Sequence, residues 1–367
     1  MVDAVVKELQ DITNKARVFV SMPYIEGLTP VIFKAENRVS RQDCGEPAER
    51  RHGIFTMEEA ALSPLDHGGL YGDAVFEGIL IVNGQIFALK EHMERWYDSA
   101  EKMQIRMPYK IAELAGWILR TVQAVGLGDD EKGYLRPVLT RGFGNLGIHP
   151  KKCVAPTIYC ICSTIRLYPP EAYEVGIQLS IARRIRRASR QFVDPNIKSN
   201  NYLNNIFGLL ETMGDGRLET LMLTPEGAVA EATADNIFLV EKSEGWQDDP
   251  SKVTVLTPSP EYCLIGITRN LTMKLARGAG YRVEETSDML PVDMVSPGKE
   301  VFLTGTGAGI MPIVGIGDVP VADGKVGPVT KKLLAGINAS MADPACGLSI
   351  HATEGEVSDY MVGPGIF

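Results

Sequence analysis

The sequence predicts an α+β protein of two domains whose sheets are mainly antiparallel. At 367 residues, the chain is longer than one hydrophobic core usually supports. Its β-rich runs follow one another through hairpin and turn signals, and its helical segments are grouped instead of alternating with strands. With 45% hydrophobic and 23% charged residues, the composition is typical of a water-soluble globular protein.

Charge and apolar patterning argue against several classes of function. The chain has 37 basic and 46 acidic residues and a net charge of −9, so nucleic acid and anionic membranes are not expected as partners. No apolar stretch reaches the length needed to span a bilayer. The N-terminal sequence mixes charges throughout and lacks the apolar core of a secretory signal.

Cysteine and histidine spacing predicts neither a disulfide framework nor a metal site. The six cysteines include no CxxC pair, and the five histidines lack metal-ligand spacing. Cys160 and Cys162 lie two apart in a predicted strand, so both side chains should point the same way. Because reduced thiols are typical of the cytoplasm, we expect a cytoplasmic protein without a structural metal.

A smaller α+β domain is expected over residues 57–167, after an N-terminal extension at 1–56. Within it, Asn83-Gly84 stands between two β-rich runs, which is the strongest short-range hairpin signal. Apolar periodicity and β-rich composition then predict, in order, helices at 90–104 and 111–122 and strands at 134–142 and 156–165.

A larger α+β domain is expected over residues 175–342, after a linker marked by paired prolines and before a C-terminal tail at 343–367. The elements expected in it are strands at 177–183, 218–224 and 229–240, and helices at 201–213, at 266–278 and from 327 onward. The helix at 201–213 should have an apolar side made by Tyr202, Ile206, Leu209, Leu210 and Met213.

The glycine-rich turn at 305–309 follows a predicted strand, as a dinucleotide-binding turn would. The third glycine falls one position early, and the residues after it do not have a helical pattern, so this interpretation is weak. Successive amides in such a turn can instead form a nest for an anion.

Lys198 and Glu231 each allow two interpretations. Lys198 lies just before a predicted helix, where a cation is disfavoured by up to about 1 kcal/mol. It is either a solvated surface lysine or, if desolvated, an amine nucleophile. Glu231 lies in a predicted strand and is either an edge-strand charge or a buried carboxylate that requires a cationic partner.

Three further residues are ambiguous when taken singly. Arg95 has the pattern of an exposed helix arginine. Tyr134 and Arg136 lie two apart in a predicted strand, so they share one face. That pair would suit either a bound carboxylate or a cross-strand ion pair.

Seven motifs occur in order over about residues 57–340: YGDAVFEGI (71–79), EHMER (91–95), YLRP (134–137), IKSNNYLNN (197–205), EATADNIF (231–238), GITRN (266–270) and TGTGAGIMPI (304–313). In this combination the chain resembles the class IV pyridoxal-phosphate aminotransferases of fold type IV, most closely their branched-chain amino-acid aminotransferases. The resemblance implies two α/β domains with the cofactor, pyridoxal 5′-phosphate, at their interface.

The resemblance also implies a role for each matching position. Lys198 would form the covalent link to the cofactor and then move a proton at the reacting carbon. Glu231 would keep the pyridine nitrogen protonated, so that the ring acts as an electron sink. The other cofactor-binding residues implied are Arg95, Ile267, Thr268 and Thr306 at the phosphate, with Tyr202 near the phenolic oxygen. The substrate-binding residues implied are Tyr71, Phe76, Tyr134, Arg136 and Gly307.

Some motif details are similar to other branches of the family. The spacing in KSNNY and the YGD sequence resemble the D-amino-acid aminotransferases, and the former also resembles the aminodeoxychorismate lyases. FEGI and YLRP resemble the branched-chain enzymes, and Leu146 stands where the D-specific branch would have its carboxylate-binding arginine.

The function implied is transamination of L-leucine, L-isoleucine or L-valine with 2-oxoglutarate by a ping-pong mechanism. The alternative is D-amino-acid transamination or aminodeoxychorismate lysis on the same fold, and a further alternative is a non-catalytic cofactor-binding protein. The implied partners are amino-acid and 2-oxo-acid substrates and a second subunit in a homodimer, without a metal.

Overall fold

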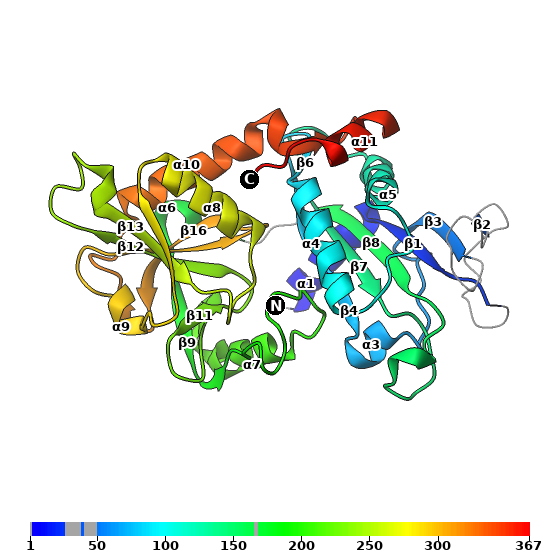
Figure 1. The fold of residues 1–367 in the computed structure, drawn as a ribbon, viewed down its shortest axis with the longest axis horizontal. Helices are drawn as coiled ribbons and strands as arrows, with labels where there is room; N and C mark the ends of the chain where they lie inside the picture. The colour runs from blue at the N-terminus through cyan, green and yellow to red at the C-terminus, as the bar shows by residue number, and fades with distance from the viewer. Residues whose placement is uncertain (1, 26–37, 40–49, 165–167) are drawn as a thin grey trace. The chain divides into compact units, whose positions relative to one another are not determined.

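The computed structural model describes residues 2–25, 38–39, 50–164 and 168–367, and its chain divides into two compact units (Figure 1). Unit 1 comprises Met1–Ile165, Ile197–Asn201 and Met341–Ile366, and unit 2 comprises Arg166–Asn196, Tyr202–Ser340 and Phe367. Each unit is built on one nine-stranded sheet with helices packed on it, which confirms the α+β class. The functional domain limits expected from the sequence stay a prediction.

The sheet of unit 1 is antiparallel throughout its described strands, in the order β18-β6-β5-β7-β8-β1-β3-β2, with β4 also paired to β7. Its strands are β1 (Arg17–Pro23), β2 (Arg38–Val39), β3 (Arg50–Thr56), β4 (Ala74–Phe76), β5 (Ile79–Val82), β6 (Gln85–Phe87), β7 (Gly133–Thr140), β8 (Thr157–Thr164) and β18 (Gly347–Ser349). The hairpin predicted at Asn83-Gly84 joins β5 to β6, and both turn residues have the positive φ angles, 51° and 69°, that a two-residue hairpin turn requires.

The helices of unit 1 are α1 (Val2–Lys15), α3 (His67–Tyr71), α4 (Leu89–Lys102), α5 (Ile111–Val125) and α11 (Glu354–Val362), with 3₁₀ turns at Pro150–Lys152 and Pro344–Cys346. The two helices predicted between residues 90 and 122 are therefore confirmed as α4 and α5. They bury Met93, Trp96, Leu114 and Ile118 in one core cluster with the strands. Cys160 and Cys162 both point into that cluster, as their alternation predicts.

The C-terminal segment 341–366 is an integral part of unit 1. Strand β18 pairs with β6, and α11 packs on α5 with Val357 and Met361 in the core. The last residues return to the start of α4, where the Ile366 amide donates to the Glu91 carboxylate at 2.6 Å. Because buried side chains of this segment belong to the core cluster, the tail stabilises the unit by apolar burial.

The sheet of unit 2 is mixed, in the order β11-β10-β9-β16-β15-β12-β13-β14, with β17 paired to β16. The pairs of β9 with β10 and with β16, and of β13 with β14, are parallel, and the other pairs are antiparallel. Its strands are β9 (Ile177–Arg186), β10 (Glu219–Leu223), β11 (Val229–Ala232), β12 (Asn236–Lys242), β13 (Val253–Pro258), β14 (Arg282–Thr286), β15 (Glu300–Gly305), β16 (Gly309–Ile316) and β17 (Val319–Pro320).

The prediction of one strand over residues 229–240 is wrong, because a turn divides it into β11 and β12. Both the amide and the hydroxyl of Thr233 donate to the buried Glu219 carboxylate, and the Ala232 amide donates to the Asp235 carbonyl. These bonds satisfy the backbone locally, so the strand pairing stops there.

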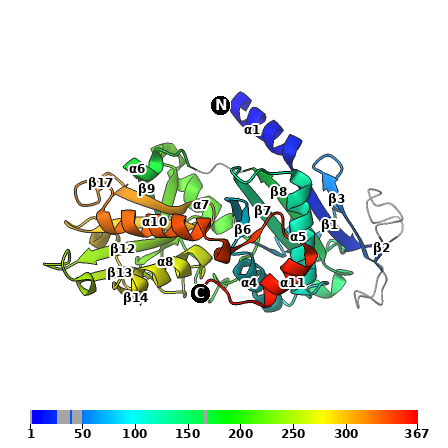
Figure 2. The same cartoon turned by 90° about the horizontal axis from the view of Figure 1, so that it is seen from above.

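The helices that begin in unit 2 are α6 (Ala172–Val175), α7 (Leu203–Thr212), α8 (Ile267–Gly278), α9 (Pro291–Met294) and α10 (Pro328–Ala342), with 3₁₀ turns at Met213–Asp215 and Pro250–Lys252. Helices α8 and α10 lie side by side in both views (Figure 2), and α8 packs on β14 and β15. The glycine-rich turn at 305–309 joins the antiparallel strands β15 and β16. Because a strand follows this turn where a dinucleotide-binding turn needs a helix, the dinucleotide interpretation fails.

Candidate active site

Unit 1 brings together four of the predicted site residues: Phe76, which ends β4, and Lys198, Arg136 and Tyr134. Lys198 belongs to unit 1 through the short segment 197–201. The Phe76 amide donates to the Lys198 carbonyl at 2.9 Å, and the Lys198 amide lies 3.3 Å from the Ser99 hydroxyl on α4. The amine Nζ of Lys198 lies 4.8 Å from the centre of the Phe76 ring. The lysine is therefore held by its backbone with its amine over an aromatic face, a favourable place for a cation.

Arg136 and Tyr134 of β7 complete this group. The Arg136 guanidinium carbon lies 4.6 Å from the centre of the Phe76 ring and 5.6 Å from that of Tyr134, so both predicted β7 residues lie on one face. Close packing fixes the phenol, because a Cβ atom on Gly78 would overlap the Tyr134 hydroxyl. A cation and a phenol beside an amine are groups that can bind a carboxylate.

Arg95, on α4, is paired with a carboxylate that the sequence did not indicate. Its Nε and Nη2 atoms donate to the two oxygens of Glu77, each at 2.7 Å, and His92 Nδ1 lies 2.8 Å from one of these oxygens. Glu77 is completely buried. Burial would raise its pKa, but Arg95 and His92 outweigh burial and hold the pKa of Glu77 well below its ordinary value.

His92 completes the Glu77 cluster from the same helix. Burial lowers the pKa of His92, although the neighbouring Glu77 carboxylate opposes this shift, so the ring tends to be neutral. The bidentate pair with Glu77 fixes the plane of the Arg95 guanidinium, which prepares it for a second anion.

Tyr71 lies at the end of α3 and is partly exposed. Its hydroxyl donates to the carbonyl of Leu146, and its ring meets His67 edge-on at 5.0 Å. Tyr71 is thus anchored to the loop that carries Leu146, and the described interactions do not tie it to the group around Phe76.

In unit 2, Glu231 is a buried carboxylate on the edge strand β11, so each of its two interpretations is partly right. One oxygen accepts from Arg187 Nε at 2.7 Å. The other accepts from the Leu264 amide at 3.2 Å and lies 3.3 Å from the Asn236 side-chain nitrogen. Arg187 is the cationic partner that a buried carboxylate requires.

Asn236 connects Glu231 to the start of α8. Its side chain also donates to the Leu264 carbonyl at 2.8 Å, and a Cβ atom on Gly266 would overlap its oxygen. Gly266 is the N-cap of α8, and no side chain caps that end. The amides of Ile267 and Thr268 therefore begin a helix whose N-terminus attracts anions.

The remaining predicted residues lie in unit 2 near these elements. Thr306 and Gly307 form the turn between β15 and β16, and both are partly buried. The turn passes close to the β11–β12 connection, since a Cβ atom on Gly305 would overlap the Asp235 carboxylate. Tyr202 immediately precedes α7 and is partly buried.

These groups fit the functional groups of pyridoxal 5′-phosphate. In unit 1, the Lys198 amine suits an aldehyde and the Arg95 guanidinium suits a phosphate. In unit 2, the N-terminus of α8 also suits a phosphate, and the buried carboxylate of Glu231 suits a protonated ring nitrogen. Among the described residues, no group of three or more His, Cys, Asp or Glu side chains is placed to hold a metal ion.

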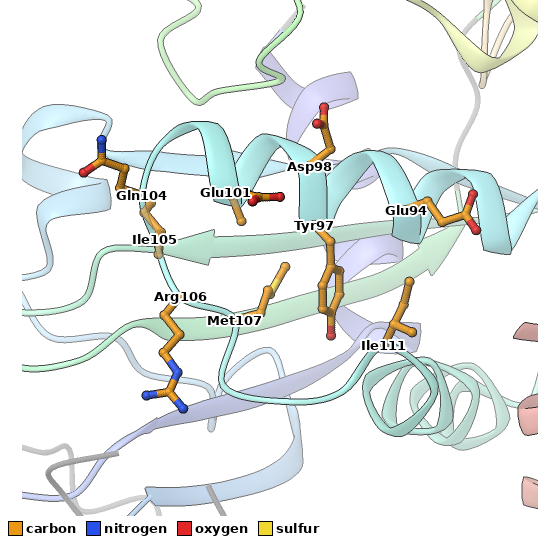
Figure 3. Close-up of a pocket in the computed structure, with 10 residues that line it drawn as sticks. Glu94, Tyr97, Asp98, Glu101, Gln104, Ile105, Arg106, Met107 and Ile111 are labelled. Atoms are coloured by element: carbon orange, nitrogen blue, oxygen red, sulfur yellow. The ribbon is translucent and has the colours of Figure 1, made fainter. Parts of the chain in front are cut away.

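Another hollow in unit 1 lies apart from these residues (Figure 3). It has a volume of about 680 Å³ and lies between α4 and the segment that follows it. Its lining residues are Glu94, Tyr97, Asp98, Ala100, Glu101, Gln104, Ile105, Arg106, Met107 and Ile111. None of the predicted site residues lines it.

Sequence reasoning missed four residues that hold the site: Glu77, His92, Asn236 and Arg187. The first three lie inside motifs quoted above, so their positions were available although no role was assigned to them. Arg187 lies in the arginine-rich stretch 183–190, which has the pattern of a solvated charged segment and gives no signal of a buried pair.

Comparisons with known proteins agree with this geometry. Residues 74–316 match the family model "Amino-transferase class IV". A Methanocaldococcus jannaschii protein classed with the branched-chain-amino-acid aminotransferases is 39% identical over 285 residues, 77% of this chain and 92% of that protein. The Pseudomonas aeruginosa branched-chain-amino-acid aminotransferase is 31% identical over 288 residues, 76% of this chain and 88% of that enzyme.

Solved structures show the same similarity. A branched-chain amino acid aminotransferase solved with pyridoxamine 5′-phosphate aligns with a TM-score of 0.70 at 28% identity, over 79% of this chain and 93% of that one. The branched-chain aminotransferase of the archaeon Thermoproteus uzoniensis, solved with norvaline, aligns with a TM-score of 0.68 at 27% identity, over 84% of this chain and 95% of that one. None of the helices that the structure describes combines the length and hydrophobicity that a bilayer crossing demands.

Proposed function

The chain belongs to the class IV aminotransferases, and from this premise we propose that it transfers amino groups between L-leucine, L-isoleucine or L-valine and 2-oxoglutarate. The cofactor is pyridoxal 5′-phosphate, and the cycle is ping-pong. The observation that supports this most strongly is the Lys198 amine over Phe76, beside the carboxylate-binding pair Tyr134 and Arg136. The named relatives and solved structures support the branched-chain substrates.

Pyridoxal 5′-phosphate supplies an electron sink that stabilises negative charge on the substrate's α-carbon. In our proposal Lys198 binds the cofactor between turnovers, and its Nζ atom then removes and returns the α-proton. The backbone bond from the Phe76 amide fixes the segment that carries this amine, so the proton transfer needs little reorganisation of the chain.

The other groups orient the cofactor in this proposal. Arg95, fixed by Glu77, would bind the phosphate, as would the amides of Ile267 and Thr268 and the residue Thr306. Glu231 holds the proton on the ring nitrogen, and its own position is fixed by Arg187.

Substrate binding is proposed for a second set of residues. Tyr134, Arg136 and the Gly307 backbone would bind the substrate carboxylate. Phe76 and Tyr71 would line the side-chain pocket, where apolar surface favours branched aliphatic groups. Tyr202 would contact the phenolic oxygen of the cofactor.

We also propose a homodimer that works in the cytoplasm on small amino and 2-oxo acids. The five described cysteines are free thiols, in keeping with a reducing compartment. The net charge of −9 suits neither nucleic acid nor an anionic membrane as a partner.

The visible absorption spectrum of the purified protein tests the activity. The lysine-bound cofactor gives a long-wavelength band, and L-leucine added without an acceptor should convert it to the pyridoxamine form. 2-Oxoglutarate should then restore the first band, as a ping-pong cycle requires. Conversion by D-alanine and not by L-leucine would contradict the proposed substrate class.

A matched pair of variants tests the lysine. Lys198→Ala should lose the long-wavelength band and turnover, because no amine remains to bind the aldehyde. Lys110→Ala, at an exposed position before α5, should keep both. Equal turnover by the two variants would disprove the role of Lys198.

A further inference from the structure

The start of helix α4 has a conformation that its own residues do not favour. Its N-cap residue, Ala88, has a φ angle of 51°, in the left-handed region that residues other than glycine rarely adopt. Among the described residues, no side chain caps this end of the helix. The His92 amide nevertheless donates to the Ala88 carbonyl at 3.1 Å, so the helical bonding begins at Ala88 itself. Contacts from outside the helix are therefore needed to hold this start in place.

The C-terminal strap, which we define as residues 343–366, supplies such contacts. The Ala88 amide donates to the Cys346 carbonyl of the strap at 2.9 Å. One turn further along, the Lys90 side-chain amine donates to the Gly363 carbonyl. Both ends of the strap are thus bonded to the first turn of α4.

Glu91 makes the most enclosed of these contacts. It is only 6% exposed, and its Oε1 atom accepts the Ile366 amide at 2.6 Å. A Cβ atom on Gly365 would lie 2.6 Å from the same oxygen, so the strap lies directly against the carboxylate. The other oxygen, Oε2, is buried without a hydrogen-bond partner in the part of the chain that the structure describes. Because a buried, unsatisfied carboxylate oxygen is costly, stability of the fold alone does not account for a glutamate at this position.

Glu91 and Arg95 lie four residues apart, which places them on one face of α4. Arg95 donates two bonds of 2.7 Å to the buried Glu77, and His92 lies 2.8 Å from the same carboxylate. Since α4 is unbroken from Leu89 to Lys102, a rotation or shift of its first turn would carry Arg95 with it. The strap at one end and Glu77 at the other therefore hold the face of α4 that carries Arg95.

We propose that Glu91 is a positioning residue for cofactor binding, through which the C-terminal strap sets the place of the Arg95 guanidinium for the cofactor's phosphate. The inference rests on the role proposed above for Arg95. A guanidinium binds phosphate well only when its planar fork of N–H groups is aligned with the oxygens, so a small displacement of α4 weakens phosphate binding. The aldehyde of the cofactor is bound by Lys198, on the separate segment 197–201, so aldehyde binding should depend much less on Glu91.

Titration of the full chain, freed of cofactor, with pyridoxal 5′-phosphate and with pyridoxal tests this. The two aldehydes differ only in the phosphate, and the long-wavelength band reports the binding of either one. Glu91→Ala removes the acceptor for the strap. It should raise the dissociation constant for pyridoxal 5′-phosphate about 10-fold, while that for pyridoxal changes less than about 2-fold.

Two matched variants accompany this substitution. Glu91→Gln keeps an oxygen that can accept the Ile366 amide, so it should restore the wild-type dissociation constants. Glu101→Ala, at an exposed glutamate on the same helix, should leave both dissociation constants unchanged.

A second pair of variants displaces the strap without altering α4. Gly365→Ala places a Cβ atom against the Glu91 carboxylate and should reproduce the loss of affinity for pyridoxal 5′-phosphate. Its control is Gly355→Ala, where the nearest atom to the added Cβ, in Thr353, lies 4.0 Å away and the affinity should be unchanged. This pair also covers the case in which Glu91→Ala does not fold, which circular dichroism would reveal.

Three results would overturn the proposal. The first is an equal loss of affinity for both aldehydes in Glu91→Ala, because a purely structural role would affect them alike. The second is unchanged affinity for pyridoxal 5′-phosphate in both Glu91→Ala and Gly365→Ala. The third is a Glu91→Gln variant that binds as weakly as Glu91→Ala. In each of these cases the proposed function stands, whereas a wild type that forms no band with pyridoxal 5′-phosphate would refute that function and this inference together.

Discussion

Replacing Glu77 by glutamine tests the buried cluster that fixes Arg95. Glutamine keeps the shape of the side chain but removes its charge, and its amide presents N–H groups to a guanidinium that also only donates. Three interactions at 2.7–2.8 Å are weakened at once, around a carboxylate that is fully buried. Breaking one partner of a buried ion pair costs about 3–5 kcal/mol, so we expect a loss of this size in the free energy of unfolding.

Urea unfolding followed by tryptophan fluorescence measures this loss. Of the three tryptophans, Trp96 and Trp117 lie in unit 1 and Trp246 lies in unit 2. A Trp246→Phe background therefore limits the signal to unit 1. Glu101→Gln, at an exposed glutamate on the same helix, serves as the control and should change stability by less than about 0.5 kcal/mol.

The pH dependence gives a second check on Glu77. Its pKa is lower in the folded protein than its ordinary value of 4.5, so its contribution is complete above that pH and is lost as the pH falls below it. The difference in the free energy of unfolding between the wild type and Glu77→Gln should therefore become smaller below pH 4.5. A difference under about 1 kcal/mol at pH 7, or one that stays constant into acid, would refute the reasoning.

Three further substitutions test other parts of the two units. Arg187→Met should lower the free energy of unfolding by about 3 kcal/mol in urea, because its partner carboxylate stays buried without a cation; an unchanged midpoint would contradict the pairing. Gly78→Ala should displace Tyr134 and raise KM for L-leucine about 10-fold. The control is Gly69→Ala, where a Cβ atom meets open space and KM should stay unchanged. Equal KM values for the two variants would disprove the steric argument. Burial, and secondarily the nearby Arg120 and Arg50, lowers the pKa of His52 to about 4. Because the unfolded chain takes up this proton near pH 6.5 and the folded protein does not, the free energy of unfolding should fall as the pH falls from 6.5 to 4. His52→Gln should therefore lose less free energy of unfolding than the wild type between pH 6.5 and 4, as measured by urea titrations across this range. Identical pH profiles of the free energy of unfolding in the two proteins would exclude a contribution from His52.

Sequence reasoning succeeded where a few neighbouring residues decide the conformation. Asn83-Gly84 can adopt the positive φ angles of its turn with little strain, so the hairpin was predictable without tertiary information. Gly266 precedes α8, and apolar periodicity located α4 and α5 within a few residues of their observed bounds.

It failed where distant residues decide the outcome. Arg187 pairs with Glu231 across 44 residues, and an arginine in a basic stretch has the same pattern whether it is solvated or buried. Periodicity likewise identified the apolar side of α7 but not what that side faces, since the polar contacts of Asn205 and Thr212 determine its orientation. The division of residues 229–240 depends on Glu219, a residue outside that segment.

The return of the C-terminal segment to unit 1 has a consequence during synthesis of the chain. The edge of β6, at residues 85–87, pairs with residues 347–349, which leave the ribosome some 260 residues later. At about 5–20 residues per second, the delay is roughly 13–52 seconds. Throughout this delay, the edge of β6 and the apolar core surface that Val357 and Met361 later cover are exposed. Exposed strand edges and apolar surfaces promote aggregation. Nascent chains should therefore need a holding chaperone at β6 until translation has passed residue 361.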